Sequence, residues 1–430
     1  MMYYATPTLN HSARSLQRAQ QMDAQDALRA FRSQYHFPLN KEGRPCTYLC
    51  GHSLGLQHKE TELATAAVFK DWREYGIDGY FHCERPWYQY HEQLIELLAP
   101  VLGAKTSEVA IMNTLSVNLH LMLASFYQPT PTRYKILIES KAFPSDIYAI
   151  KSWLKLRGYD PTEAIIELSS AEGEQAIEES TIESVLTSRG SEIALVLIGG
   201  VNYFTGQVFD FERITELAHQ QGCKVGFDVA HAAGNVVLQL HEWQVDFAVG
   251  CTYKYLNGGP GSIATCFVHE RFHKDNSLNR LEGWWGNKPS TRFQMTPTFD
   301  PIEGAQAWAI SCPPIFGMAT LERSLKVFNT IGMEALRQKS IGLIHYLDEL
   351  LAPLEADGII EILTPKSIDA RANQWSIRLK RGGRAVFERL LAQGVIGDWR
   401  EPNLIRIALA PTYNSYEDAW QFYNALKNSL

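Results

Sequence analysis

The sequence has no long hydrophobic run, no paired-cysteine motif and no low-complexity segment. No apolar stretch approaches the roughly 20 residues that a membrane-spanning helix requires, and residues 1–23 lack the apolar centre of a secretory signal. The seven cysteines are odd in number, scattered and without a CxxC pair, which argues against a disulfide framework and a structural zinc site. We therefore expect a cytoplasmic protein with reduced thiols, no metal and no membrane partner.

An excess of positive charge is also missing. The 47 acidic residues outnumber the 40 basic ones and give a net charge of −7, whereas a general nucleic-acid binder needs an electropositive face. We therefore expect no nucleic-acid partner. The chain does have 430 residues, 45% of them hydrophobic, which is enough for two or three domains with packed cores.

The middle of the chain alternates short β-branched runs with helical patterns. Strands are predicted at residues 135–138, 193–198, 224–227 and 247–250, and helices at 117–126, 145–156 and 211–221. The strands are apolar on both faces, as in a parallel sheet that helices cover on both sides. The predicted fold class is therefore α/β, with a mostly parallel sheet flanked by helices and ligand sites beyond the carboxyl ends of its strands.

The first hundred residues contain three helical patterns. One covers Asp23–Gln34 and another covers about Tyr90–Leu102. The third begins at Thr61 and predicts an amphipathic helix. Its apolar positions are Leu63, Val68, Phe69 and Trp72.

The pattern changes at Ser311–Pro314, which we interpret as a hinge. Beyond it, helices at 316–328, 333–351 and 384–392 alternate with strands at 359–363, 374–379 and 404–407, and a last helix begins with the capping box of Ser415 and Asp418. We predict three parts. They are an N-terminal arm of residues 1–50 that packs with the small domain, a large domain of residues 51–311, and a smaller α+β domain of residues 312–430.

Asp228 and Lys254 follow two successive predicted strands. Asp228 ends the run Val225–Asp228, where an ionised carboxylate is costly unless a cation meets it. Lys254 lies past the next strand, between Tyr253 and Tyr255 and before a glycine-rich run. A lysine that forms a Schiff base and a carboxylate that keeps a pyridine nitrogen protonated are what pyridoxal phosphate needs. A buried Asp–Lys ion pair accounts for the same residues equally well.

Two further segments suit the same cofactor. Ser116 precedes an apolar helix, so its hydroxyl and the nearby amides can hold a phosphate; an ordinary N-cap serine is the alternative. The segment Phe143, Pro144, Ser145 and Asp146 follows a strand and offers a ring to stack on a flat cofactor; the alternative is a loop leading into an Asp-capped helix. These signals converge on one cofactor, pyridoxal phosphate.

From Tyr48 onward, over about nine-tenths of its length, the chain resembles the kynureninase family of pyridoxal-phosphate hydrolases. The motifs that carry the resemblance are Gly51–Leu56, Arg85–Trp87, Met112–His120, Phe143–Asp146, Tyr203–Gln207, Gly226–Asn235, Tyr253–Asn257, Gly283–Phe293 and Arg406 with Pro411–Ser415. Asp and Lys alone also fit cysteine desulfurases and aminotransferases, but the motifs together are specific. The resemblance implies the transferase-like fold type I of pyridoxal-phosphate enzymes.

The resemblance implies roles for the matching residues. Lys254 would carry the cofactor and later move protons, Asp228 would pair with the pyridine nitrogen near His231, and Tyr253 would bind the phosphate and act in catalysis. The cofactor would also be contacted by Leu115, Ser116, Phe143, Pro144, Ser145, Asp146 and Cys312. Family sites lie at a dimer interface, so the protein would be a homodimer in which Trp284 reaches the phosphate from the second subunit.

The substrate side carries one clear match and several departures. Arg406 matches the arginine that takes the substrate carboxylate, for which a planar fork is suited; a surface ion pair is the alternative. Tyr80 stands where human-like members have a histidine facing the substrate ring. His52 replaces an asparagine of the Gly-Asn-Ser-Leu-Gly loop, and a structural histidine is the alternative there. Gly199 stands where relatives can have a serine, and Cys312 where some have an asparagine.

The implied reaction is hydrolysis of L-kynurenine or 3-hydroxy-L-kynurenine to anthranilate or 3-hydroxyanthranilate plus L-alanine. It would place the protein in tryptophan catabolism and NAD biosynthesis through the kynurenine pathway. A cysteine desulfurase is one alternative, but it needs a mobile cysteine in the last third, and none follows Cys312. An aminotransferase, which would need a keto-acid acceptor, is another. A non-catalytic binding protein is the third, and the intact Asp228 and Lys254 argue against it.

Overall fold

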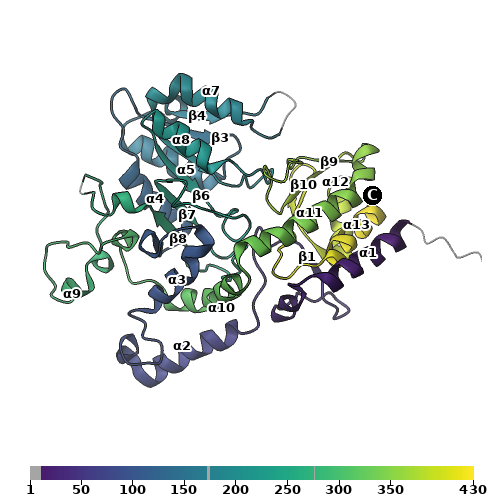
Figure 1. Ribbon diagram of the computed structural model, residues 1–430, viewed down its shortest axis with the longest axis horizontal. Coiled ribbons are helices and arrows are strands. Elements are labelled where there is room, and N and C mark those ends of the chain that lie inside the picture. The colour runs from purple at the N-terminus through teal and green to yellow at the C-terminus, as the bar shows by residue number, and fades with distance from the viewer. Residues whose placement is uncertain (1–10, 172–174, 276) are drawn as a thin grey trace, which may run out of the picture.

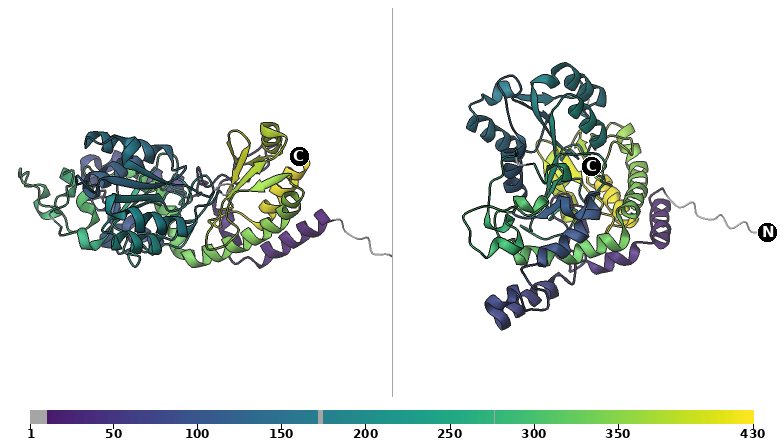
Figure 2. Two further views of the ribbon diagram at one scale, coloured as in Figure 1. Left: turned by 90° about the horizontal axis from the view of Figure 1, so that it is seen from above. Right: turned by 60° about the vertical axis from the view of Figure 1, so that its left-hand side comes forward.

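The chain folds into two lobes, each built on its own β-sheet (Figure 1). This computed structural model describes residues 11–171, 175–275 and 277–430. Helix α1 (His11–Gln25) runs along the smaller lobe beside α13 (Tyr416–Ser429), so the two ends of the described chain meet there. Figure 2 shows the two lobes side by side, with the larger sheet and its helices in one and the C-terminus in the other.

The larger lobe contains a seven-stranded sheet. Its strands, in spatial order, are β2 (Val109–Ile111), β8 (Thr265–Val268), β7 (Phe247–Gly250), β6 (Lys224–Asp228), β5 (Ile193–Gly199), β3 (Lys135–Glu139) and β4 (Ile165–Leu168). All neighbours from β7 to β4 pair in parallel, whereas β8 is antiparallel to both β7 and β2. The predicted α/β fold with a mostly parallel sheet is therefore confirmed.

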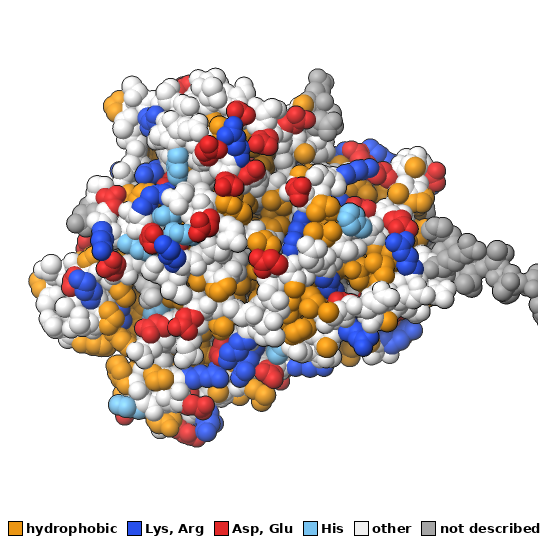
Figure 3. Space-filling view, viewed as in Figure 1, with side chains coloured by type: hydrophobic (Ala, Val, Ile, Leu, Met, Phe, Trp, Pro, Cys, Tyr) orange, Lys and Arg blue, Asp and Glu red, His pale blue; other side chains and the backbone are white. Residues whose placement is uncertain are grey.

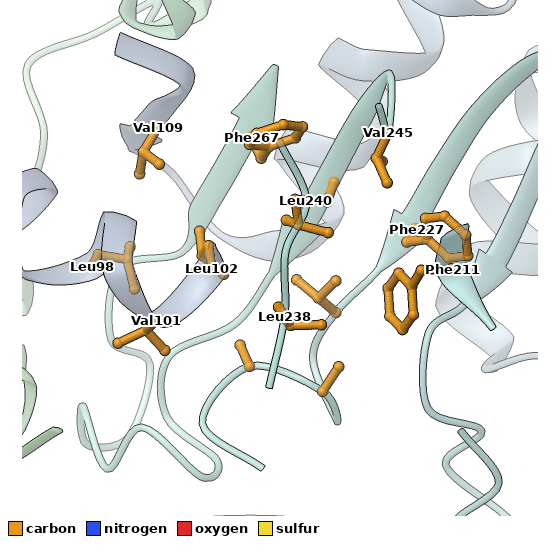
Figure 4. Close-up of a cluster of buried hydrophobic side chains, with 14 of the residues drawn as sticks. Leu98, Val101, Leu102, Val109, Phe211, Phe227, Leu238, Leu240, Val245 and Phe267 are labelled. Atoms are coloured by element: carbon orange, nitrogen blue, oxygen red, sulfur yellow. The ribbon is translucent and has the colours of Figure 1, made fainter. Parts of the chain in front are cut away.

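Helices cover both faces of this sheet because alternate strand residues enter opposite cores. On β3, Leu137 belongs to one buried cluster and Ile136 and Ile138 to the other. The first cluster includes side chains of α3 (Tyr90–Leu102), α7 (Glu179–Arg189), α8 (Phe211–Gln220) and α10 (Ile315–Ile331). The second includes those of α4 (Leu115–Phe126) and α5 (Pro144–Leu156). Figure 4 shows part of the first cluster, where the ring of Phe211 lies 4.3 Å from that of Phe227.

The smaller lobe holds an antiparallel sheet. Its strands, in spatial order, are β12 (Asp398–Arg400), β13 (Leu404–Ile407), β10 (Trp375–Leu379) and β9 (Ile360–Ile362). Its helices are α11 (Met333–Ala356), α12 (Gly383–Ala392) and α13. A two-stranded parallel pair, β1 (Thr47–Tyr48) with β11 (Val395–Ile396), joins the N-terminal segment to this lobe. The domain boundaries at residues 50 and 311 stay a prediction, and residues 1–10 of the proposed arm lie outside the described residues.

The structure corrects one of the helices predicted near the N-terminus and confirms another. The continuous helix predicted at Asp23–Gln34 is wrong, because α1 ends at Gln25 and Arg29–Gln34 forms a separate 3-10 helix. The carboxylate of Asp26 accepts the N–H of Leu28 there, a local bond that competes with the helix. Helix α2 (Thr61–Tyr75) is confirmed as a helix. The short helices α6 and α9 cover Pro161–Ala164 and Pro289–Arg292.

Only part of the apolar face of α2 is buried within this chain, since Val68 is buried and the ring of Phe69 lies 4.7 Å from that of Phe316 on α10. Leu63, Phe69 and Trp72 remain 69%, 53% and 58% exposed. Figure 3 shows hydrophobic side chains among charged ones over this lower edge of the molecule. Apolar side chains that stay this exposed on one face are typical of an interaction surface.

Two further expectations bear on the character of the chain. All seven cysteines are free thiols, so the prediction of no disulfide framework is confirmed. Within the described ranges, no helix is both long enough and apolar enough to cross a membrane.

The junction between the two chain ends generates a prediction. The carboxylate of Asp23 accepts the N–H groups of Tyr416 and Glu417, at 2.8 and 3.0 Å, and thereby caps α13 from α1. We expect Asp23→Ala to lower the free energy of unfolding by about 1–2 kcal/mol, because two helix N–H groups lose their acceptor. Urea denaturation measures the change. Glu349→Gln, which breaks only the exposed pair with Arg18, is the control and should change it by less than about 0.5 kcal/mol.

Candidate active site

A pocket opens at the carboxyl ends of β3, β5 and β6, where the parallel sheet predicts a ligand site. Its walls come from strand ends, from the first turns of α4 and α5, and from the loop after β7. The lining residues are Leu115, Ser116, Glu139, Phe143, Ser145, Asp146, Gly199, Val201, Tyr203, Asp228, Ala230, His231, Tyr253 and Lys254. Nine residues predicted from the sequence to contact the cofactor are among them.

Asp228 is the last residue of β6 and is buried. Its carboxylate accepts the N–H of Ala230 at 2.7 Å. Burial raises the pKa of Asp228, while the nearby cation of Lys254 and the Ala230 N–H act in the opposite direction. The two residues singled out from the sequence therefore share one pocket and act on each other electrostatically.

Phe143 provides a flat apolar wall next to Lys254. The Lys254 Nζ lies 5.8 Å from the centre of the Phe143 ring. Tyr203 and Phe143 meet edge-on with ring centres 5.2 Å apart, and Phe143 remains 41% exposed. Phe143 is the N-cap residue of α5, and Pro144 occupies the first helical turn, where its missing N–H costs nothing. Pro144 does not line the pocket, so its contribution is to the backbone.

The helix starts differ from the simple capping alternatives. The N-cap of α4 is Thr114 and makes no side-chain capping bond, whereas the exposed Ser116 lies inside the first turn. Likewise, Asp146 lies in the first turn of α5 rather than at its cap. One carboxylate oxygen of Asp146 is buried without a hydrogen-bond partner among the described residues. Both helices thus present polar groups to the pocket that their own capping does not use.

Two buried imidazoles extend the polar surface of the site. His231 lines the pocket, and the ring of His52 lies 6.5 Å from it. Burial, together with the Arg406 and Lys254 cations, lowers the pKa of His52 to about 4 and that of His231 well below its usual value. Nδ1 of His231 has no hydrogen-bond partner among the described residues, whereas Nε2 of His52 lies 3.8 Å from the carboxylate of Asp398. The substrate contact of His52 and its structural alternative both stay predictions.

Arg406 is buried, with 1% of its surface exposed, so the surface-ion-pair alternative is wrong. Its Nε donates to the carboxylate of Asp398 at 2.8 Å, and its terminal nitrogens donate to Asp398 and to the backbone oxygen of Tyr203. Although burial raises it, the pKa of Asp398 is held well below its usual range by His52 and Arg406. The guanidinium lies 5.6 Å from the centre of the Tyr203 ring, which itself lines the pocket.

Besides Pro144, His52 and Arg406, three predicted residues do not line this pocket. Tyr80 packs edge-on against Trp87 at 5.3 Å, and its hydroxyl interacts with the thiol of Cys312. Trp284 is 41% exposed and donates from its indole to the backbone oxygen of Arg292 at 2.9 Å. The predicted contacts of Trp284 and Cys312 with a cofactor are thus not made within one chain.

Sequence reasoning did not single out Glu139, Tyr203 or Asp398 as site residues. Glu139 ends the apolar strand β3 just as Asp228 ends β6, so the same criterion identifies it. Tyr203 lies within one of the recognised motifs, but nothing in the sequence indicates that it lies between Arg406 and the pocket. Asp398 carries no local signal, because its role depends on pairing with Arg406 across β12 and β13.

A second cluster of titratable groups lies at the opposite end of the sheet. Ligand atoms of Glu108, His241 and His269 come within 4.8 Å of one another. Hydrogen bonds already use the Glu108 carboxylate, which accepts the N–H groups of Lys105 and Glu270 and contacts Nδ1 of His241. The two imidazoles stack with their ring centres 5.0 Å apart, instead of converging on a common point. We interpret the cluster as a structural contact between β2 and β8.

The Arg406–Asp398 pair generates a second prediction. We expect Asp398→Asn to lower the free energy of unfolding by about 3–5 kcal/mol at pH 7, because it leaves the buried guanidinium without a counter-ion. The difference should shrink as the pH falls through the depressed pKa of Asp398, where the pair is lost in the parent protein as well. Urea denaturation at several pH values measures it. Glu401→Gln, which removes the exposed partner of Arg384, should cost less than about 0.5 kcal/mol.

Comparison with known proteins identifies relatives along nearly the whole chain. A sequence profile of the kynureninase C-terminal domain matches residues 336–426. The chain is 47% identical to the kynureninase of Flavobacterium psychrophilum over 418 residues, which cover 97% of this chain and 98% of that protein. It is 48% identical to the kynureninase of Koribacter versatilis over 94% of this chain and 95% of that protein. For the Myxococcus xanthus kynureninase the identity is 47%, over 98% of both.

Solved structures resemble the fold at much lower sequence identity. The cysteine desulfurase CsdA of Escherichia coli matches with a TM-score of 0.75 at 14% identity, over 94% of this chain and 98% of that one. A structure of C-DES with glycine covalently linked to its PLP cofactor matches with a TM-score of 0.75 at 17% identity, over 89% and 96%. These matches establish fold type I, as predicted. With nearly half of its residues identical to those of several kynureninases along almost its full length, the chain belongs to the kynureninase family.

Proposed function

We propose that this protein is a kynureninase that hydrolyses the Cβ–Cγ bond of L-kynurenine or 3-hydroxy-L-kynurenine with pyridoxal phosphate as its cofactor. The products are anthranilate or 3-hydroxyanthranilate and L-alanine. Family membership supports the activity. The observation that carries the proposal is that Lys254 and Asp228 line one pocket. Arg406 lies next to Tyr203, which lines the same pocket.

The residues of the pocket fit the cofactor. Lys254 would hold it covalently, Asp228 would meet its pyridine nitrogen, and Phe143 would stack on its ring. The unused N–H groups at the start of α4, with the hydroxyl of Tyr253, would hold its phosphate. Unpartnered buried atoms of Asp146 and His231 indicate a site built for a polar ligand. When bound, pyridoxal phosphate supplies an electron sink for the charge that develops at the substrate Cα.

Arg406 would bind the carboxylate of the substrate. Asp398 holds the Nε side of its guanidinium, so the fork has a fixed orientation before substrate arrives. The buried ion pair also avoids a bare cation in the free enzyme.

Lys254 and Tyr253 would move protons during the reaction. Lys254 would accept the proton of the substrate Cα, because the amine that holds the cofactor in the free enzyme would lie next to that atom. Burial raises the pKa of Tyr253, and the neighbouring Cys251 and Asp228 raise it further, so the phenol keeps its proton. A protonated phenol can donate a hydrogen bond to the γ-carbonyl as water attacks there. The neutral His52 and His231 add polar contacts without adding charge.

The desulfurase alternative finds support only in the shared fold. No cysteine follows Cys312, and Cys312 lies beside Tyr80 rather than in the pocket. An aminotransferase would consume a keto acid and would release no alanine from kynurenine.

Incubation with each substrate tests the activity. We expect alanine and the matching anthranilate to appear in equal amounts from kynurenine, from 3-hydroxykynurenine or from both, without added keto acid. The ratio of the two rates gives the substrate preference. Lys254→Ala should abolish turnover, and Tyr253→Phe should slow it at least tenfold with cofactor still bound. Release of no alanine from either substrate would contradict the function, and full turnover by Tyr253→Phe would contradict the role of the phenol.

We also propose that the protein is a homodimer in the reducing cytoplasm. The seven free thiols support the compartment. The exposed apolar side chains support the dimer, because they gather on α2, on the turn that follows it and on the segment around α9. They are Leu63, Phe69, Trp72, Ile77, Phe81, Trp284, Phe293 and Met295. Pairing through this surface would bury the face of α2 and let Trp284 reach the site of the second subunit.

Analytical ultracentrifugation of a charge-introducing variant tests the dimer. We expect the parent protein to sediment as a dimer and Phe69→Asp with Trp72→Asp to sediment as a monomer with weakened activity, because two charges would enter an apolar interface. Tyr148→Asp alters a side chain that is 67% exposed on α5 and should leave the dimer intact. An active parent protein that sediments as a monomer would rule out the shared site.

A further inference from the structure

Three carboxyl groups and one amine surround the pocket. Glu139, Asp146 and Asp228 are all buried, and Lys254 is the cation that lines the same pocket. Carboxylates confined together in a buried site cannot all ionise against one positive charge, since each further anion repels the others and loses its hydration. At least one of the three acids must therefore keep its proton near neutral pH.

Glu139 has little to compensate a negative charge on its carboxyl group. Both of its carboxylate oxygens lie near one donor, the N–H of Gly199, at 3.1 and 3.2 Å. The positive charge of Lys254 acts on Asp228 and on Asp146, but does not figure among the groups that act on Glu139. Burial and, to a lesser degree, the charge of Asp228 raise the pKa of Glu139 to about 8, against the lowering effect of the Gly199 N–H. The pKa of Asp146 is also raised well above its usual range, by burial and by the charges of Asp228 and Glu139, so Glu139 and Asp146 both keep a proton more readily than Asp228.

The surroundings of Glu139 supply no other charge that could ionise it. On one side, β4 places the apolar Leu168 in register with it. On the other side, β5 contributes Gly199, whose own register partner on β6 is Asp228. The titratable groups that face Glu139 are thus Asp228 from β6 and Asp146 from α5, both acidic, with Lys254 beyond them across the pocket.

Gly199 makes room for this acid. A Cβ atom on residue 199 would lie 2.8 Å from Oε1 of Glu139, closer than side chains approach without displacement. With a side chain at residue 199, the carboxyl group of Glu139 would have to shift. Gly199 at the end of β5 and Glu139 at the end of β3 are thus in direct contact.

We propose that Glu139 is an uncharged positioning residue of the active site, which keeps its proton at neutral pH, fixes the end of β5 through Gly199 and leaves Asp228 as the carboxylate that faces Lys254. The proposal rests on the proposed function only for the identity of the ligand. Ionisation of Glu139 in alkali would add a negative charge beside Asp228. That charge would weaken the binding of an anionic cofactor.

The stability of the cofactor-free protein tests the protonation directly. An acid that is protonated in the folded state and ionised in the unfolded state makes stability fall as the pH rises between its unfolded and folded pKa values. We expect the unfolding equilibrium constant of the parent protein to rise by up to tenfold per pH unit, relative to Glu139→Gln, between about pH 5 and 8. Glu167→Gln removes an exposed carboxylate from the neighbouring strand β4 and should follow the parent profile. Parallel profiles for the parent protein and Glu139→Gln would overturn the proposal.

Cofactor affinity provides the readout that a merely structural role would not move. We expect Glu139→Gln to bind pyridoxal phosphate within threefold of the parent protein at pH 6.5, and at least threefold more tightly than the parent at pH 9.5. A tenfold loss of affinity at pH 6.5 would show that an ionised Glu139 is needed and would overturn the proposal. Neither measurement uses kynurenine, so their failure is distinct from failure of the proposed function.

Infrared spectroscopy keeps the proposal testable if Glu139→Gln does not fold. Protein labelled with ¹³C at the glutamate carboxyl separates glutamate bands from aspartate bands. A Glu92→Gln background removes the other described glutamate whose pKa burial raises. We expect a protonated glutamic acid carbonyl band at pH 7 that is lost by about pH 10. No such band at pH 7 would overturn the proposal.

Discussion

The compensation of buried charge is the constraint on which this active site depends. Each ionised group that the sheet ends hold out of water needs a partner, because desolvation penalises the charged form by several kcal/mol. In the larger lobe the acids outnumber the amine, so at least one acid stays neutral. In the smaller lobe Asp398 pairs with the buried Arg406 and with the more exposed Arg400. The two charge sets meet at Tyr203, whose ring contacts Phe143 on one side and the guanidinium on the other.

The topology of the large sheet creates this crowding. Parallel strands bring their carboxyl ends to one edge, and β3, β5 and β6 are neighbours there. Glu139, Gly199 and Asp228 each end one of these strands. A side chain at the middle position would lie between two acids, and the glycine leaves that space open. The same edge receives the first turns of α4 and α5, of which α4 carries no acid and α5 adds Asp146.

The sequence predicts the parts of this arrangement that depend on local pattern. The bounds of α3, β7 and β13 follow from periodicity alone, and the positions of Asp228 and Lys254 after apolar strands place them at the ligand edge. The sequence does not predict Asp398, because its role depends on pairing with Arg406 across β12 and β13. The strand β12 is also too short to show a periodic pattern. The helix α2 was predicted from its apolar spacing, yet the spacing alone does not tell whether that face meets this chain or another.

The two lobes also differ in the charged group that each would bind. Within the smaller lobe, the Arg406–Asp398 pair is neutral overall, so the lobe can fold without an unpaired buried ion. Binding a carboxylate there adds one negative charge beside a guanidinium whose three nitrogens already donate to Asp398 and to the backbone oxygen of Tyr203, so the second N–H of each terminal nitrogen would have to reach the carboxylate. In the larger lobe the excess lies with the acids, which suits a cationic ring nitrogen beside Asp228, whereas the phosphate would meet the N–H groups at the start of α4. The cation for the substrate carboxylate thus comes from the smaller lobe, and the acid for the ring nitrogen comes from the larger lobe. Tyr203 lies between them.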